Sequence, residues 1–206
     1  MFTGIVQGIG EVTAVKKDPG FMRFAVATDL KLLSGLQTGA SVAIDGVCLT
    51  AASFDASTVW FDAIQETLAR TNLKLLRERQ KVNIERSARF GDEIGGHLLS
   101  GHIVATATID RIERTQNNCV VFFRCSPEWT KYLLPKGYVA LNGVSLTLVT
   151  VDRTKGLFSV HLIPETLERT TFGTVKEGDA INIEIDSQTQ TIVDTLERLY
   201  AIKSTS

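Results

Sequence analysis

The sequence predicts a mainly β fold: two tandem six-stranded antiparallel β-barrels of Greek-key type with short helices, followed by a C-terminal α-helix. The main observation is a repeat. The run 45–50, Asp-Gly-Val-Cys-Leu-Thr, returns 97 residues later at 142–147 as Asn-Gly-Val-Ser-Leu-Thr. In both copies, short β-branched and aromatic stretches alternate with turn residues. A period near 100 residues indicates a duplicated domain, because solenoid units are only about 20 to 50 residues long.

The repeat extends over nearly the whole chain. Residues 66–68, Glu-Thr-Leu, recur at 165–167, and residues 83–85, Asn-Ile-Glu, recur at 182–184. The offset has grown there to 99 residues, so the second copy has two more residues in an intervening loop. With 206 residues, 44% of them hydrophobic, the chain suits two small domains that each bury a core. We expect barrels at 1–97 and 98–189 and an oligomerisation helix at 190–206.

Composition argues against several functional classes. The formal net charge is −1, with 22 basic and 23 acidic residues, which provides no positive field for nucleic acid. Neither a secretion signal nor a run of about 18 apolar residues is found, so we expect a cytoplasmic protein without membrane contact. Cys48, Cys119 and Cys125 form no C-x-x-C pair, which predicts free thiols and neither a disulfide framework nor a zinc site.

The elements of the first copy follow in order. Residues 5–15 and 21–27 alternate around a turn at 16–20, which predicts a hairpin. Thr28 and Asp29 can cap a short helix that runs through Leu36. Three short strands are expected next, at 41–44, 48–54 and 58–64.

The second copy repeats this order. Ser126 caps a helix through Leu134 with Pro127 at the first helical position. Strands are expected at 138–141, 145–151 and 157–163. Closing six short strands into a barrel removes the exposed edges that a small sheet cannot cover.

A glycine-rich hinge at 95–102 joins the copies, and a helical pattern follows the second one. The pattern consists of apolar residues three, four and seven apart: Ile192, Val193, Leu196, Leu199 and Tyr200. A lone helix of about 15 residues is marginal in water, so this one packs on its own domain or on the same helix of neighbouring subunits. We favour self-association.

Positions where the copies differ are candidates for chemistry that only one copy performs. Cys48 corresponds to Ser145, Ser41 to Tyr138, Ile5 to His102, Phe2 to Leu99, and Ser87 to Asp186. A cysteine on an apolar strand is usually a small core hydrophobe, but the hydroxyl at the matched position favours contact with a ligand. His102 is either a hydrogen-bonded structural imidazole or a proton carrier. Asp186 either begins a turn or bears charge beside a ligand.

Two further patterns are ambiguous. His97 and His102 lie five residues apart with no further ligand in reach, which argues against a metal site. Pro164 opens a short helix, whose free backbone N–H groups could, together with Thr166, hold a carbonyl or hydroxyl group. Helix capping alone would equally explain Glu165 and its counterpart Glu66.

The chain resembles the riboflavin synthase family of the trimeric, two-barrel type. The motifs that carry the resemblance are long and cover essentially the whole chain: residues 1–6 (Met-Phe-Thr-Gly-Ile-Val), 46–50, 95–102 (Gly-Gly-His-Leu-Leu-Ser-Gly-His), 142–147 and 161–170. Val47, where a second cysteine often stands in the family, and the short tail after Ile202 depart from the family pattern.

The resemblance implies an activity and a site. The family dismutates two molecules of 6,7-dimethyl-8-ribityllumazine into riboflavin and a ribitylamino pyrimidinedione, without a cofactor. By resemblance, Gly4, Ile5, Val6, Cys48, Leu49, Thr50, Asp62, Ala63, Ile64, Gln65, Glu66 and Thr67 line the first pocket, and Gly101, His102, Ile103, Lys136, Ser145, Leu146, Thr147, His161, Leu162, Ile163, Pro164, Glu165 and Thr166 line the second. Cys48 and Ser41 are expected to assist addition at the acceptor ring, and His102, Thr147 and Asp186 to handle protons or charge at the donor ring.

The resemblance also implies partners. It predicts a homotrimer with sites between subunits, and it makes lumazine synthase a candidate for association. A non-catalytic lumazine- or flavin-binding antenna protein with the same two barrels is the alternative, although both Gly-Val-Cys/Ser-Leu-Thr runs survive here. A nucleic-acid-binding barrel is disfavoured by the charge and by the absence of surface aromatic pairs.

Overall fold

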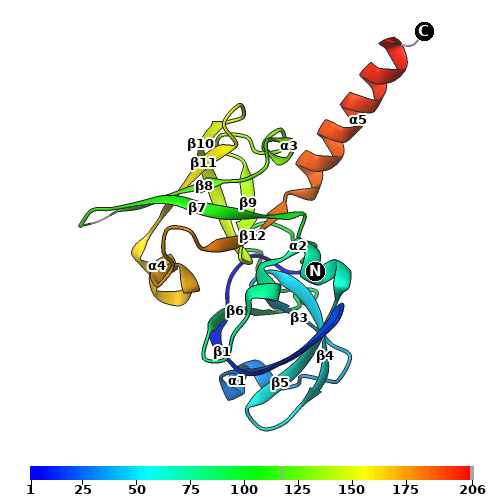
Figure 1. Cartoon of the computed structure of the whole chain (residues 1–206), viewed down its shortest axis with the longest axis vertical. Helices are drawn as coiled ribbons and strands as arrows, with labels where there is room; N and C mark the ends of the chain where they lie inside the picture. The colour runs from blue at the N-terminus through cyan, green and yellow to red at the C-terminus, as the bar shows by residue number, and fades with distance from the viewer. Residues whose placement is uncertain (117, 205–206) are drawn as a thin grey trace.

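The computed structural model, which describes residues 1–116 and 118–204, contains two barrels and a projecting helix (Figure 1). The strands of the first barrel are β1 (Gly8–Asp18), β2 (Phe21–Ala27), β3 (Ser41–Ile44), β4 (Val47–Phe54), β5 (Thr58–Ile64) and β6 (Lys81–Arg86). They close in the order β1-β2-β5-β4-β3-β6, and every neighbouring pair is antiparallel.

The second barrel repeats this circuit. Its strands are β7 (Ala105–Arg114), β8 (Cys119–Arg124), β9 (Tyr138–Leu141), β10 (Val144–Asp152), β11 (Leu157–Leu162) and β12 (Ala180–Ile185). They close as β10-β11-β8-β7-β12-β9, the same neighbours in the same relative order. The register also shifts at matching places, between Val12 and Ala14 in β1 and between Ile109 and Arg111 in β7. The predicted fold of two six-stranded barrels is confirmed.

Short helices connect the strands. They are α1 (Leu30–Leu33), α2 (Gln65–Arg70), η1 (Asn72–Leu75), α3 (Pro127–Thr130), α4 (Pro164–Arg169) and η2 (Thr171–Gly173). Asp29 caps α1 as predicted, but the helix ends at Leu33 because Ser34 is extended and Gly35 takes a positive φ of 65°. α3 likewise ends at Thr130, before the predicted Leu134. Both helices are therefore single turns.

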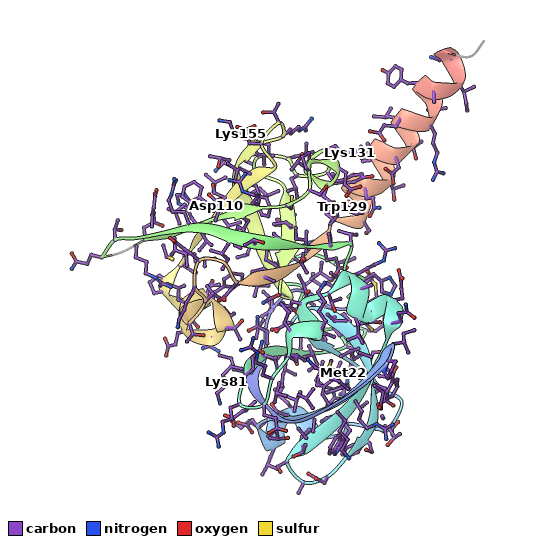
Figure 2. All side chains as sticks on the ribbon, in the orientation of Figure 1. Met22, Lys81, Asp110, Trp129, Lys131 and Lys155 are labelled. Carbon is purple, nitrogen blue, oxygen red and sulfur yellow. The ribbon has the colours of Figure 1, made fainter. Side chains whose placement is uncertain are left out.

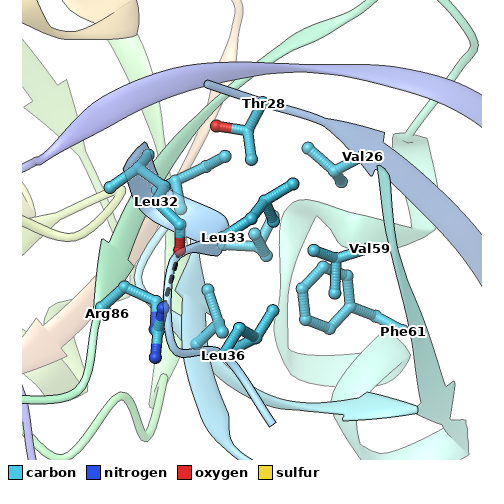
Figure 3. A pocket seen from close by; sticks show the side chains of 11 residues that line it. Val26, Thr28, Leu32, Leu33, Leu36, Val59, Phe61 and Arg86 are labelled. Carbon is cyan, nitrogen blue, oxygen red and sulfur yellow. Dashed lines mark hydrogen bonds between the residues drawn. The ribbon is translucent and has the colours of Figure 1, made fainter. Parts of the chain in front are cut away.

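Each barrel encloses its own apolar core. Phe24 and Phe61 pack with ring centroids 5.6 Å apart in the first barrel, and Phe123 stacks on Phe158 at 5.2 Å in the second. The first core leaves a cavity of about 10 Å³ beneath α1, between Leu33, Leu36 and Phe61 and their neighbours (Figure 3). This space is about that of one water molecule, so it is a packing defect of the core.

The barrels meet through two glycine turns that lie back to back. Gly46 and Gly143 have positive φ of 79° and 78° and follow Asp45 and Asn142, which also lie in the left-handed region. A Cβ on Gly46 would lie 2.5 Å from the Gly143 backbone nitrogen, and a Cβ on Gly143 would lie 2.8 Å from the Gly46 nitrogen. No other residue fits at this contact.

Asparagines fasten the two turns across the interface. The Asn83 side-chain amide of β6 donates to the Asn142 carbonyl at 2.9 Å, and the Asn182 amide of β12 donates to the Asp45 carbonyl at 2.9 Å. Each also accepts from a backbone N–H of the opposite copy: Asn83 from Thr171 and Asn182 from Asn72. All are buried, so these bonds satisfy polar groups that water cannot reach.

The C-terminal helix α5 (Ser187–Ser204) leaves the second barrel and projects away from both barrels (Figure 1). Its first turns dock beside α3, where Lys131 and Trp129 lie (Figure 2). Lys131 Nζ lies 2.5 Å from the Glu197 carboxylate, Tyr132 donates to Asp194 at 2.5 Å, and Val193 packs on the second core. Among the described residues, no helix is long and apolar enough to cross a bilayer.

Candidate functional site

The segments that precede the two barrels are exchanged. The Gly4 carbonyl, at the start of the first copy, accepts from Ser145 N–H in the second barrel at 2.8 Å. The Gly101 carbonyl, at the start of the second copy, accepts from Cys48 N–H in the first barrel at 2.9 Å. The segments cross as a short antiparallel bridge between Phe2 and Leu99. We call residues 1–6 and 98–103 the leader segments. The first leader segment therefore lies beside the Ser145 strand of the second barrel, and the second lies beside the Cys48 strand of the first barrel.

Two buried glutamates hold the leader segments in place. Glu85 accepts from the backbone N–H groups of Thr3 and Gly4 and from the Thr3 hydroxyl, at 2.6 to 3.1 Å. Its counterpart Glu184 accepts the same set of bonds from Ser100 and Gly101, at 2.7 to 3.1 Å. Burial raises the pKa of both carboxyl groups, although these hydrogen bonds oppose the shift.

The exchange corrects the predicted division of residues between the pockets. Gly4 lies against Ser145, and Val6 packs on the second core. Gly101 lies against Cys48, and Ile103 belongs to the first core. The prediction gave each leader segment to its own barrel, which was wrong because sequence matching aligns the copies without revealing that they cross. The His102 backbone consequently runs beside Cys48, away from the second barrel's Ser145.

In the first barrel, Cys48 of β4 and Ser41 of β3 lie on adjacent strands. We call the surface around them the first mouth, and the matching surface around Ser145 and Tyr138 the second mouth. Cys48 is half-buried and opposite Ala43, while Ser41 is half-buried and opposite the exposed Thr50. The Ser41 carbonyl accepts from the Ser87 hydroxyl at 2.8 Å. This part of the first barrel therefore presents a thiol and hydroxyl groups.

The second barrel has a different set of groups at the same place. His97 Nδ1 lies 2.6 Å from Ser145 Oγ, and the His97 ring stacks on Tyr138 with centroids 5.0 Å apart and planes 16° apart. Burial lowers the pKa of His97, and the charge of Asp186 opposes this shift. Asp186 also caps α5 by accepting from the Thr189 N–H and hydroxyl, so it begins a helix and not the expected turn.

His97 was not among the predicted site residues. Comparison of the copies could not find it, because the stretch matched between them begins at Met1 and Leu98, and His97 lies just before that stretch. The only sequence signal was its place in the Gly-Gly-His run. Gly96 permits its approach, since a Cβ there would lie 2.2 Å from the Thr3 carbonyl oxygen and 3.0 Å from Ser145 Oγ.

The strand ends that lead into α2 and α4 form the outer wall of each mouth. Ile64 and Ile163 are 61% and 62% exposed, which leaves an apolar side chain at the same place in each copy. Asp62 makes a bidentate pair with Arg23 at 2.6 Å, whereas its counterpart His161 is exposed. The acidic residues of the two helices pair with arginines one turn later, Glu66 with Arg70 and Glu165 with Arg169.

The remaining predicted residues divide by exposure. Leu49, Ala63, Leu146 and Leu162 are buried in the two barrel cores. Thr67 and Thr166 are half-buried, and Gln65, Pro164, Ile5, His102, Thr147 and Lys136 are exposed. The mouths are thus open surfaces in a single chain.

Lys136 occupies a strained position beside the second mouth. Its φ is +68°, and its backbone N–H donates to the Leu148 carbonyl at 2.8 Å. The matched residue is Gly39, with φ +89° and the same bond to Ala51 at 2.9 Å. A non-glycine residue with positive φ costs about 1–2 kcal/mol. The second copy therefore has a lysine at a backbone position that favours glycine.

No group of three metal-ligating side chains occurs within residues 1–116 and 118–204. The three cysteines are free thiols in this structure, as predicted. Cys119 and Cys125 are buried, and burial raises the pKa of Cys125 to about 11, so that thiol stays protonated near neutral pH. Cys48 alone of the three lies at a barrel mouth.

Comparison with known proteins gives consistent matches. A family model described as the lumazine binding domain matches residues 3–87 and again 100–186. Riboflavin synthase of Escherichia coli (strain K12) is 48% identical over 98% of this chain and 95% of its own, and that of Chlamydia pneumoniae is 46% identical over 98% of both chains. The solved structure of LumP complexed with riboflavin superposes with a TM-score of 0.83 at 26% identity, covering 91% of this chain and all of that one.

Proposed function

The chain belongs to the riboflavin synthase family of lumazine-binding proteins, and we propose that it converts two molecules of 6,7-dimethyl-8-ribityllumazine into riboflavin and 5-amino-6-(D-ribitylamino)uracil. The enzyme class is a transferase, because a four-carbon unit passes from one lumazine to the other. All atoms of the two products come from the two substrates. The reaction therefore needs no cofactor, oxidant or reductant.

This proposal depends on one observation: the two mouths have the same backbone arrangement but different side chains. Both mouths are built from one Gly-Val-Cys/Ser-Leu-Thr strand and one exchanged leader segment. Because the backbones match, both mouths can bind the same lumazine ring. Because the side chains differ, the two bound rings can undergo different steps of the reaction. Holding two rings in a fixed relation replaces a collision in solution with a preset geometry.

The first mouth holds the acceptor ring in this proposal. Cys48 and Ser41 assist addition at its electrophilic carbons, and His102 joins them because its leader segment lies on the Cys48 strand. The second mouth holds the donor ring, which loses a proton from its C7 methyl group. Thr147 and Asp186 lie on the elements that border this second mouth, where a developing charge needs compensation.

The openness of each mouth supports a site shared between chains. Ile64 and Ile163 remain mostly exposed, and a mouth of one subunit placed over the unlike mouth of its neighbour would cover them. The exposed apolar residues of α5, Ile192, Leu196 and Leu199, provide a surface for joining three chains. The expected compartment is the cytoplasm, and lumazine synthase, which would supply the substrate, is a candidate partner.

A direct assay tests the activity. Purified protein mixed with the lumazine and no additive should form riboflavin, detected by its absorbance, with two lumazines consumed for each riboflavin. A solved relative, LumP, binds riboflavin, so an antenna-like binding role is the competing function. Tight lumazine binding without riboflavin formation would favour that role and contradict the enzyme.

Truncation tests the assembly. Removal of residues 192–206 should shift the mass in solution from trimer toward monomer and abolish turnover, because the unlike mouths no longer meet. The matched control ends the chain after Ile202 and keeps the apolar positions of α5, so it should remain trimeric. Analytical ultracentrifugation measures both. A trimer formed without residues 192–206 would refute the role of α5.

A further inference from the structure

The second mouth contains a buried histidine paired to a serine hydroxyl. The His97 imidazole is 7% exposed, and its Nδ1 lies 2.6 Å from Ser145 Oγ. Two contacts orient the ring: Tyr138 stacks on its face, and Ser145 Oγ lies at Nδ1. The His97 backbone is held from the first leader segment, because its main-chain N–H donates to the Thr3 carbonyl at 3.1 Å, and Gly96 leaves room for this approach.

The other ring nitrogen has no partner. His97 Nε2 is buried without a hydrogen bond among the described residues. A neutral imidazole carries one proton, so the contact at Nδ1 decides the state of Nε2. If Ser145 O–H donates to Nδ1, then Nε2 carries the proton. The hydroxyl oxygen of Ser145 is then free to receive a proton from a ligand while its own proton moves to Nδ1.

We propose that His97 and Ser145 form a proton-accepting pair that deprotonates the C7 methyl group of the lumazine bound at the second barrel. This rests on the proposed function. Ser145 is the residue that touches the substrate, and His97 is a positioning residue that acts through it. The pair replaces His102 as the acid–base group of the donor ring, because the His102 leader segment lies against the first barrel.

The proton transfer balances within the site. The methyl C–H bond breaks, its proton passes to Ser145 Oγ, and the hydroxyl proton of Ser145 passes to His97 Nδ1. The electron pair stays on the lumazine as a carbanion conjugated with the ring, ready to attack the acceptor. His97 becomes an imidazolium, whose charge the Asp186 carboxylate stabilises.

The pair also explains why only one barrel would act as the base. In the first barrel, Cys48 takes the place of Ser145, so a thiol stands where the second barrel has the hydroxyl that pairs with His97. Three other ionisable groups nearby are already in contact with other parts of the chain. Glu85 and Glu184 are bonded to the leader segments, and the Tyr138 ring lies on the imidazole face. Within residues 1–116 and 118–204, the imidazole that contacts a hydroxyl group is therefore the one at the second barrel.

A double-mutant cycle tests the proposal. His97→Asn places an amide group near the position of Nδ1, so it keeps a hydrogen bond to Ser145 but cannot hold a proton. We expect kcat to fall about 100-fold with KM changed by less than about 3-fold. Ser145→Ala should cost about the same, and the double variant should be no worse than Ser145→Ala, because each removes the same function. The acidic limb of the kcat profile should disappear in His97→Asn.

The experiments distinguish a failure of the His97–Ser145 pair from a failure of the proposed riboflavin-forming activity. Wild-type protein that forms no riboflavin contradicts the function itself. An active wild type whose His97→Asn variant keeps kcat within about 2-fold, or whose double variant multiplies the two single losses, overturns the histidine–serine pair alone. Nitrogen-15 NMR of the three histidines provides a readout without activity or mutation. His97 should carry its proton on Nε2, and a proton on Nδ1 would overturn the pair even if the variants fail to fold.

Discussion

Where the two barrels touch, they present nearly the same groups to each other, and at their mouths they present different ones. Glu85 matches Glu184 bond for bond, and Gly46 matches Gly143 in both φ and contact. The first mouth carries the Cys48 thiol, whereas the second carries the hydrogen-bonded His97–Ser145 pair. The shared groups fix the backbone, so the duplicated chain could change the mouths without disturbing the contact.

Breaking the shared contact should have the largest effect. Gly46→Ala places a methyl group 2.5 Å from the Gly143 nitrogen in a left-handed residue, so we expect a loss of about 4 kcal/mol in the free energy of unfolding. Gly178→Ala is the matched control, because Gly178 has φ +89° with nothing within 4 Å. It should lose only about 1 kcal/mol. Equal losses in urea denaturation would show that strain alone matters and that the barrels can separate.

The next prediction transfers a residue from the second turn to the first. Asp45 is buried where the second copy has Asn142, and burial raises its pKa from 3.8 to about 7. The folded state thus keeps a proton that the unfolded chain gives up. The stabilisation from protonated Asp45 is complete below about pH 4 and is lost as pH rises through 7.

Asp45→Asn should remove this dependence. The amide oxygen can still accept from Asn83 N–H, as the Asp45 carboxyl does at 2.8 Å. Relative to wild type, the variant should gain about 4 kcal/mol between pH 4 and pH 8, measured by denaturation at each pH. A difference between the two proteins that stays constant over that range would mean that Asp45 is ionised throughout.

A third prediction concerns catalytic turnover. Cys48→Ser gives the first barrel the side chain of the second. We expect turnover to fall about 30-fold with little change in lumazine affinity, because the hydroxyl fits the space of the thiol but is less nucleophilic and less polarisable. Stopped-flow turnover and fluorescence titration measure the two quantities. Equal losses in turnover and affinity would make Cys48 a binding residue.

The sequence predicted the barrels because their signals are local. Strand patterns, turn glycines and the repeat of the Gly46 run each need only a short window. It did not predict the exchange of the leader segments, since matching Gly4 with Gly101 is compatible with either barrel as their partner. It also missed His97, whose hydrogen-bond partner Ser145 lies 48 residues away and which precedes the stretch matched between the copies.

The smallest predicted effect concerns the position where the first copy has Gly39 and the second copy has Lys136. Lys136→Gly gives the second barrel the residue of Gly39 and removes the strain of φ +68°, so stability should rise by about 0.5–1 kcal/mol. Lumazine affinity should fall because the ammonium group at the second mouth is lost. Arg79→Gly is the matched control, since Arg79 has the same φ but lies outside the candidate site. It should gain similar stability with unchanged affinity. If Lys136→Gly also left affinity unchanged, Lys136 would have no part in binding, and the strain at that position would have no functional explanation.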